Sequence, residues 1–275
     1  MPTLADSRPV GVFDSGLGGL TAVRAIKSIL PSQDILYLGD TARLPYGTKS
    51  DKVIVQYALE GLRFFLRRNV KALVIACGTM STVAPEALSA ASPVPVLTVV
   101  GPAAAEAAAA TKSRRVGLIA TPASVRSNVY EKALLAIDPA IRVTARACPL
   151  FVPLVENGRV TRGDIVLETV AREYLADLKA ARVDTLALGC THYPLLMDVI
   201  SDVMGADVAL IDAGAAVARA LKRHLEAADA LPPQGAAGTQ KFFVTDTAEG
   251  FAGLAELFLK NSTQDLVDSI DILTD

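Results

Sequence analysis

Two cysteines far apart in the chain have matching surroundings. Cys77 follows the apolar run 72–76, Cys190 follows the apolar run 185–189, and small or hydroxyl residues come directly after both. A short apolar run that ends in small polar residues is typical of a buried parallel strand entering a loop. Open α/β sheets bind ligands beyond the carboxyl ends of their strands. The pattern therefore predicts a pair of acid/base thiols on either side of one pocket.

Other polar residues follow apolar runs in the same way. Asp14 enters a glycine-rich turn, which is equally compatible with a plain tight turn and with a cradle for an anion. Asp40 and Arg43 form either a structural ion pair or part of the pocket. Glu156 stands in a segment where a glutamate is usually solvated. His192 is close enough to Cys190 in sequence to lower the pKa of a thiol or to move a proton, although a lone histidine is more often structural.

The composition argues against several classes of protein. The chain has 275 residues with 27 basic against 29 acidic side chains, and the absence of a basic stripe argues against a nucleic-acid partner. No apolar run is long enough to span a membrane, and the first residues do not resemble a signal peptide. Three cysteines, of which Cys148 is interpreted as a buried structural thiol, do not form a disulfide framework, so we expect a cytoplasmic protein. Two histidines without metal-binding spacing indicate no metal site.

Strand-like runs alternate with helical patterns along the chain. This alternation predicts an α/β fold with parallel sheets built from βαβ units. We expect strands at 10–14, 35–39, 72–76, 94–99, 115–120, 141–145, 185–189, 208–211 and 241–245. We expect helices at 20–30, 52–68, 165–180 and 213–228, among others.

A weak internal repeat indicates two related halves. Residues 10–15 resemble residues 116–121 at an offset of 106, and the two cysteine strands are offset by 113. We therefore expect two pseudo-symmetric, Rossmann-like domains with the active site between them. Residues 1–98 plus 211–275 would form the first domain, which carries Cys77. Residues 99–210 would form the second domain, which carries Cys190.

The segments around these residues resemble the glutamate racemases of the aspartate/glutamate racemase superfamily. The similarity covers most of the chain and occurs in the family's order. The matching segments are 11–21, 39–47, Ala76 and Cys77 with Thr79, 151–156, and 189–196.

The resemblance implies interconversion of L- and D-glutamate without a cofactor. Cys77 would act on D-glutamate and Cys190 on L-glutamate, with Asp14 assisting the first thiol and His192 with Glu156 assisting the second. It also implies a homodimer and a supply of D-glutamate for peptidoglycan. The implied substrate-binding residues are Asp14, Ser15, Asp40, Pro45, Tyr46, Gly47, Gly78, Thr79, Thr121, Thr191 and His192.

One position departs from the family pattern. The chain has Gly78 where the family has an asparagine that contacts the substrate. Loss of one hydrogen bond to a charged ligand costs roughly 1.5–3 kcal/mol if nothing replaces it. We therefore expect Gly78→Asn to lower the Michaelis constant and to leave turnover similar. A racemase for aspartate or a hydantoin, a binding or regulatory homologue, and a thiol redox protein are the alternatives.

Overall fold

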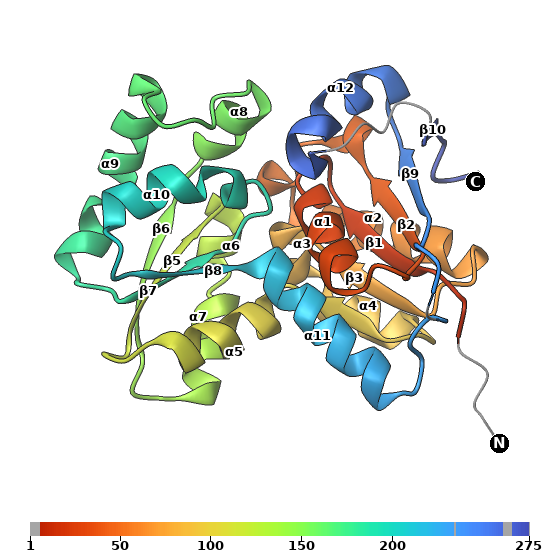
Figure 1. The fold of residues 1–275 in the computed structure, drawn as a ribbon, viewed down its shortest axis with the longest axis horizontal. Coiled ribbons are helices and arrows are strands. Elements are labelled where there is room, and N and C mark those ends of the chain that lie inside the picture. The colour runs from red at the N-terminus through yellow and green to blue at the C-terminus, as the bar shows by residue number, and fades with distance from the viewer. Residues whose placement is uncertain (1–5, 234, 261–265, 275) are drawn as a thin grey trace.

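The computed structural model describes residues 6–233, 235–260 and 266–274, and it places two parallel sheets side by side, each flanked by helices (Figure 1). The strands are β1 Val10–Asp14, β2 Ile35–Gly39, β3 Ala72–Ile75, β4 Val96–Thr98, β5 Arg115–Ala120, β6 Arg142–Ala147, β7 Thr185–Leu188, β8 Ala209–Asp212, β9 Gln240–Val244 and β10 Val267–Ser269. The α-helices are α1 Leu20–Ile29, α2 Asp51–Arg67, α3 Gly78–Val83, α4 Pro85–Ala91, α5 Val100–Ala110, α6 Pro122–Arg126, α7 Val129–Ile137, α8 Phe151–Glu156, α9 Ile165–Ala180, α10 Met197–Met204, α11 Ala213–Ala227 and α12 Ala248–Leu259. Short 3-10 turns lie at Thr41–Arg43, Tyr46–Thr48 and Tyr193–Leu196.

The larger sheet has six strands in the order β10-β9-β2-β1-β3-β4, and the smaller has four in the order β6-β5-β7-β8. All of their strand pairs are parallel. All five residues of β1 are buried, as the apolar composition of a central parallel strand requires. The predicted α/β fold with two parallel sheets is confirmed.

The strand register brings the predicted chemical groups to the carboxyl ends of both sheets. Phe13 of β1 pairs with Ile75 of β3, so the residues that follow these two strands leave the larger sheet at one edge. In the smaller sheet Ile119 of β5 pairs with Leu188 of β7, which has the same effect at its own edge. Ligand sites in open α/β sheets form at such edges.

The two lobes contact each other through helices and through the loops beside the sheets. Strand β8 of the smaller sheet leads into α11, which packs against α1 of the other lobe (Figure 1). The hydroxyl of Thr21 in α1 donates a hydrogen bond of 3.0 Å to the backbone carbonyl of Thr191. The ring of His192 lies edge-on to Phe258 of α12 at 5.4 Å.

The nine predicted strands all occur, with ends that shift by at most two residues. Strand β10 was not predicted, because the sequence Val267–Ser269 carries an aspartate and has no apolar run. The predicted junction between residues 210 and 211 falls inside β8 of the smaller sheet, and the junction between residues 98 and 99 falls between β4 and α5. The domain boundaries themselves remain a prediction.

Candidate active site

A cavity of about 490 Å³ lies between the two lobes at the strand ends. Both predicted thiols, Cys77 and Cys190, line it, and neither is in a disulfide. The other predicted site residues in its wall are Ser15, Pro45, Tyr46, Gly47, Gly78, Thr79, Thr121, Glu156, Thr191 and His192. The structure thus brings together residues from both halves of the chain around one space.

Cys77 caps the N-terminus of α3 and is almost fully buried. Its sulfur accepts the backbone N–H of Met80 at 3.5 Å, and the thiol donates to the Ser15 hydroxyl at 3.5 Å. Burial, together with the carboxylate of Asp14, raises the pKa of Cys77 to about 12. Cys77 is therefore a neutral thiol at neutral pH.

Cys190 has a different set of neighbours. The Nδ1 atom of His192 lies 3.9 Å from its sulfur, and Nε2 of the same ring lies 3.0 Å from Oε1 of Glu156. Burial lowers the pKa of His192, but the interactions with Cys190 and Glu156 outweigh it and raise this pKa to about 10. A positively charged imidazole consequently stands beside Cys190 at neutral pH.

Asp14 is buried behind Cys77 and is not among the residues that line the cavity. Its Oδ2 accepts the backbone N–H of Gly16 at 2.9 Å, while Oδ1 has no hydrogen-bond partner. Burial raises the pKa of this carboxyl group. Asp14 is thus placed to influence Cys77 electrostatically, and its contact with a substrate stays a prediction.

Asp40 also lies outside the cavity wall, and its contact with the substrate stays a prediction. Its carboxylate is fully buried, pairs with the guanidinium of Arg43, and accepts the hydroxyls of Tyr46 and Thr245. Arg43 also pairs with Glu60, which lies on α2. Asp40 therefore holds the turn that presents Tyr46 to the cavity, and the ion pair between Asp40 and Arg43 is present.

Two hydroxyl groups meet across the cavity. The Oγ1 atoms of Thr79 and Thr121, one from each lobe, are 3.2 Å apart. Thr121 also caps α6 by accepting the backbone N–H of Ser124 at 3.3 Å. These hydroxyls are suitable hydrogen-bond donors for a carboxylate that lies between the lobes.

Part of the cavity wall was missed by sequence reasoning. Cys148, which we interpreted as a structural thiol, is fully buried and lines the cavity together with Pro149 and Val152. These residues sit at the end of β6 and on α8, so they reach the same edge as Cys190. The segment 151–156 had signalled this region, but an apolar side chain carries no sign of its role in a polar site.

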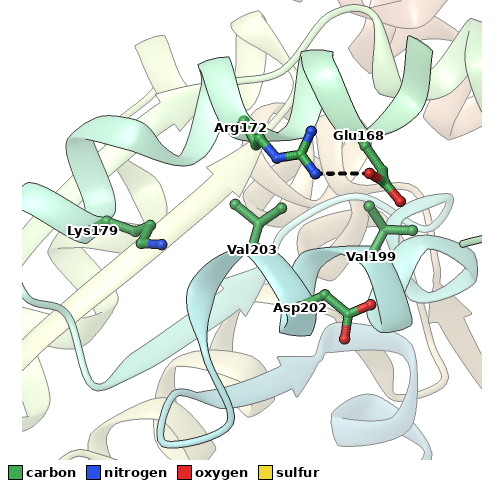
Figure 2. A pocket seen from close by; sticks show the side chains of 6 residues that line it. All are labelled: Glu168, Arg172, Lys179, Val199, Asp202 and Val203. Atoms are coloured by element: carbon green, nitrogen blue, oxygen red, sulfur yellow. Dashed lines mark hydrogen bonds and ion pairs between the residues drawn. The ribbon is translucent and has the colours of Figure 1, made fainter. Parts of the chain in front are cut away.

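A second, smaller cavity of about 200 Å³ lies between α9 and α10, away from the thiols (Figure 2). Two of its charged groups pair with each other, Arg172 with Glu168 at 2.8 Å, and Asp202 pairs with Arg162, which is not part of the cavity wall. It contains none of the predicted site residues.

Among the described residues, no group of three or more His, Cys, Asp or Glu side chains could hold a metal ion. None of the helices in residues 6–233, 235–260 and 266–274 is long and apolar enough to cross a membrane.

Two parallel-sheet lobes that share one cavity, with a thiol from each lobe in its wall, define a two-lobed α/β protein whose cavity lies at the strand ends. Residues 21–221 match the model of the Asp/Glu/Hydantoin racemase family, and the chain belongs to this family. Glutamate racemase from Geobacter metallireducens is 44% identical over 94% of this chain and 95% of its own length.

Solved structures agree with this assignment. The crystal structure of glutamate racemase from Francisella tularensis in complex with D-glutamate has a TM-score of 0.88 and 38% identity, and the match covers 97% of this chain and 98% of that chain. A glutamate racemase isoform from Bacillus anthracis has a TM-score of 0.91 and 34% identity, over 98% and 99% of the two chains. The resemblance that the sequence motifs indicated is confirmed.

Proposed function

We propose that this protein interconverts L- and D-glutamate without a cofactor, with Cys77 and Cys190 as the two proton-transfer groups. The observation that carries the proposal is the single cavity with one thiol from each lobe in its wall. The relatives named above are glutamate racemases, and one of their structures contains D-glutamate.

Inversion requires one group to take the α-proton from one face and another group to give a proton to the other face. In the L-to-D direction, the Cys190 thiolate removes the α-proton and becomes a thiol, and the bonding electrons remain on the α-carbon and its carboxylate. The Cys77 thiol then donates its proton to the opposite face and becomes a thiolate. The reverse direction exchanges the two roles, which is why a pair with one ionised and one neutral member serves both.

The environments of the two thiols support this starting state. Cys77 rests as a neutral thiol, because burial and Asp14 raise its pKa to about 12. The charged imidazole of His192, held by Glu156, provides a counter-ion for a thiolate at Cys190. His192 and Glu156 are thus placed to assist Cys190 as the base for L-glutamate, with Cys77 as the proton donor.

Negative charge that develops on the substrate carboxylate needs donors that are already in place. Ser15, Thr79, Thr121 and Thr191 supply hydroxyls from both lobes. Fixed donors in a site that excludes water stabilise a developing oxyanion far more than solvent-exposed donors do. The turn of Pro45, Tyr46 and Gly47, which Asp40 holds, is suited to the side-chain carboxylate of glutamate.

The test is an assay of the pure protein with each enantiomer of glutamate, and no added cofactor, followed by polarimetry. We expect the rotation of either enantiomer to decay towards zero. Aspartate and a hydantoin, the alternatives that Gly78 and the family description keep open, belong in the same panel. Turnover of one of these and none of glutamate would replace the proposed substrate, and a folded protein that turns over none would favour a binding role.

We extend the proposal to three further properties. The product D-glutamate would supply peptidoglycan synthesis in the cytoplasm, as the family resemblance implies. A homodimer is the simplest assembly, because two-fold symmetric dimers are the commonest oligomers. Sedimentation at several protein concentrations tests the assembly, and a monomer at every concentration would contradict it.

A further inference from the structure

Two glycines that neighbour the two thiols in the sequence are in close backbone contact in the cavity wall. Gly78 follows Cys77, and Gly189 precedes Cys190. A β-carbon built on Gly78 would lie 2.5 Å from the backbone carbonyl oxygen of Gly189. Observed β-carbons do not approach other atoms so closely, and the obstacle is a backbone atom that cannot rotate away.

Gly189 has no room to withdraw from this contact. Its N–H donates a hydrogen bond of 2.8 Å to the carbonyl of Ile119 in β5. A β-carbon on Gly189 would lie 3.0 Å from the side chains of both Ala120 and Leu118. The end of β7 is thus pressed against β5 on one side and against Gly78 on the other.

Backbone hydrogen bonds also fix the chain on either side of Gly78. The N–H of Ala76 donates to the carbonyl of Phe13 at 2.9 Å, which ties the end of β3 to β1. The N–H of Ser81 donates to the carbonyl of Cys77 at 2.9 Å, which fixes the start of α3. Relief of any added volume at position 78 must therefore come from movement of one lobe against the other.

From this geometry we infer that Gly78 is a positioning residue for proton transfer, because its contact with the Gly189 carbonyl sets the separation of the Cys77 and Cys190 sulfurs. The inference rests on the proposed two-thiol function and adds the element that fixes its geometry. A side chain at position 78 acts as a wedge between the residues that carry the two thiols. The room around Gly78 also opposes the expectation that Gly78→Asn would leave turnover similar.

The test is Gly78→Ala, with Gly101→Ala as the matched control. Both glycines lie in the first turn of a helix, but a β-carbon on Gly101 meets no atom within 4 Å. A displacement of about 1 Å in a reacting group costs on the order of 100-fold in rate. We expect Gly78→Ala to lower kcat roughly 10- to 100-fold in both directions, with a smaller change in KM, and Gly101→Ala to match the wild type.

Deuterium incorporation in D₂O distinguishes a larger distance between the two thiols from a smaller fraction of folded enzyme. When the distant thiol donates slowly, the first thiol has time to exchange its proton with solvent and to return deuterium to the same face. The ratio of deuterated substrate with retained configuration to deuterated inverted product should therefore rise in Gly78→Ala. A smaller folded fraction lowers both products alike and leaves this ratio unchanged.

Alkylation by iodoacetamide, mapped by peptide mass spectrometry, gives a readout that needs no turnover. A wedge should speed the reaction of Cys77 and Cys190, which are 5% and 7% exposed, whereas Gly101→Ala should react at the wild-type rate. A kcat within twofold of the wild type, a fall in kcat with an unchanged deuterium ratio, or alkylation of Cys77 and Cys190 at the wild-type rate would overturn the inference. The last result would place Gly78 in a rigid core instead of at a movable contact. A wild-type protein without turnover would refute the proposed function instead.

Discussion

His192 connects the charge state of the site to the stability of the whole fold. Its pKa in the folded protein is about 10, against an ordinary value of 6.5, because Cys190 and Glu156 favour the charged ring more strongly than burial opposes it. A raised pKa stabilises the folded state fully below pH 6.5. This contribution is lost as the pH rises from 6.5 towards 10, since the unfolded chain releases the proton first.

We expect Glu156→Gln to flatten this pH dependence, because the neutral amide no longer favours the charged ring. The raised pKa of His192 by itself makes the free energy of unfolding fall by up to about 1.4 kcal/mol per pH unit between pH 6.5 and 9, the slope for one proton, and the variant should lose part of this contribution. Denaturant unfolding at several pH values measures it, with the exposed Glu249→Gln as the control. Identical slopes for wild type and Glu156→Gln would contradict the assigned charge on His192.

Replacement of either cysteine should largely abolish inversion and leave α-proton exchange with one enantiomer of glutamate. A positioned acid/base group contributes about 10²–10⁴-fold in rate, so Cys77→Ser and Cys190→Ser should each lower racemisation by that order. Cys77→Ser should still exchange the α-proton of L-glutamate, and Cys190→Ser that of D-glutamate. Cys148→Ala, which removes the third thiol, should retain most of the turnover. The two-thiol account fails if either serine variant racemises at a near-normal rate.

Residue types and their order in the chain predicted the thiol pair and its polar partners, because chemistry at strand ends leaves a local pattern. They could not predict the position of Asp40. Its partners Arg43, Glu60 and Thr245 come from three separate segments, and only the folded chain joins them. The close approach of Gly78 to Gly189 was equally hidden, since a backbone contact has no sequence signal.

At the scale of elements, helix α2 packs closely against the larger sheet because Gly61 has no side chain. A β-carbon on Gly61 would lie 2.1 Å from the ring of Phe13 in β1. Apolar runs predicted both the helix and the strand, but the distance between them follows from packing that the sequence pattern does not contain.

We expect Gly61→Ala to destabilise the protein by about 1–3 kcal/mol, the usual cost of an overpacked core. Gly253→Ala is the matched control, because it also lies inside a helix, α12, and a β-carbon there meets nothing within 4 Å. The control should be stabilised by roughly 0.5–1 kcal/mol, since alanine favours a helix over glycine. Thermal and denaturant unfolding of both variants measure the difference, and equal effects would contradict the packing account.

At the scale of the whole molecule, the site belongs to neither lobe alone. Its hydroxyls Thr79 and Thr121 meet from opposite lobes, and Thr21 is bonded to Thr191 across the same contact. The internal repeat predicted two halves with a site between them, whereas the helix contacts that join the halves, such as α11 with α5, have no counterpart in the repeat.

A ligand held by both lobes should stabilise them together. At one hundred times its dissociation constant, glutamate should add about 2.7 kcal/mol to the free energy of unfolding. We expect a single transition that shifts as a whole in calorimetry, with D-lysine as a control ligand of the wrong charge. Two transitions, of which only one responds to glutamate, would assign the site to one lobe.

The most direct test of the central claim is the early time course of L-glutamate racemisation in D₂O, with the isotope at Cα measured separately in each enantiomer. Two opposed thiols predict that newly formed D-glutamate carries deuterium while the remaining L-glutamate is still mostly protiated, because the proton is lost to one group and replaced from another. D-glutamate that retains the original proton would show that a single group works on both faces, and it would contradict the account.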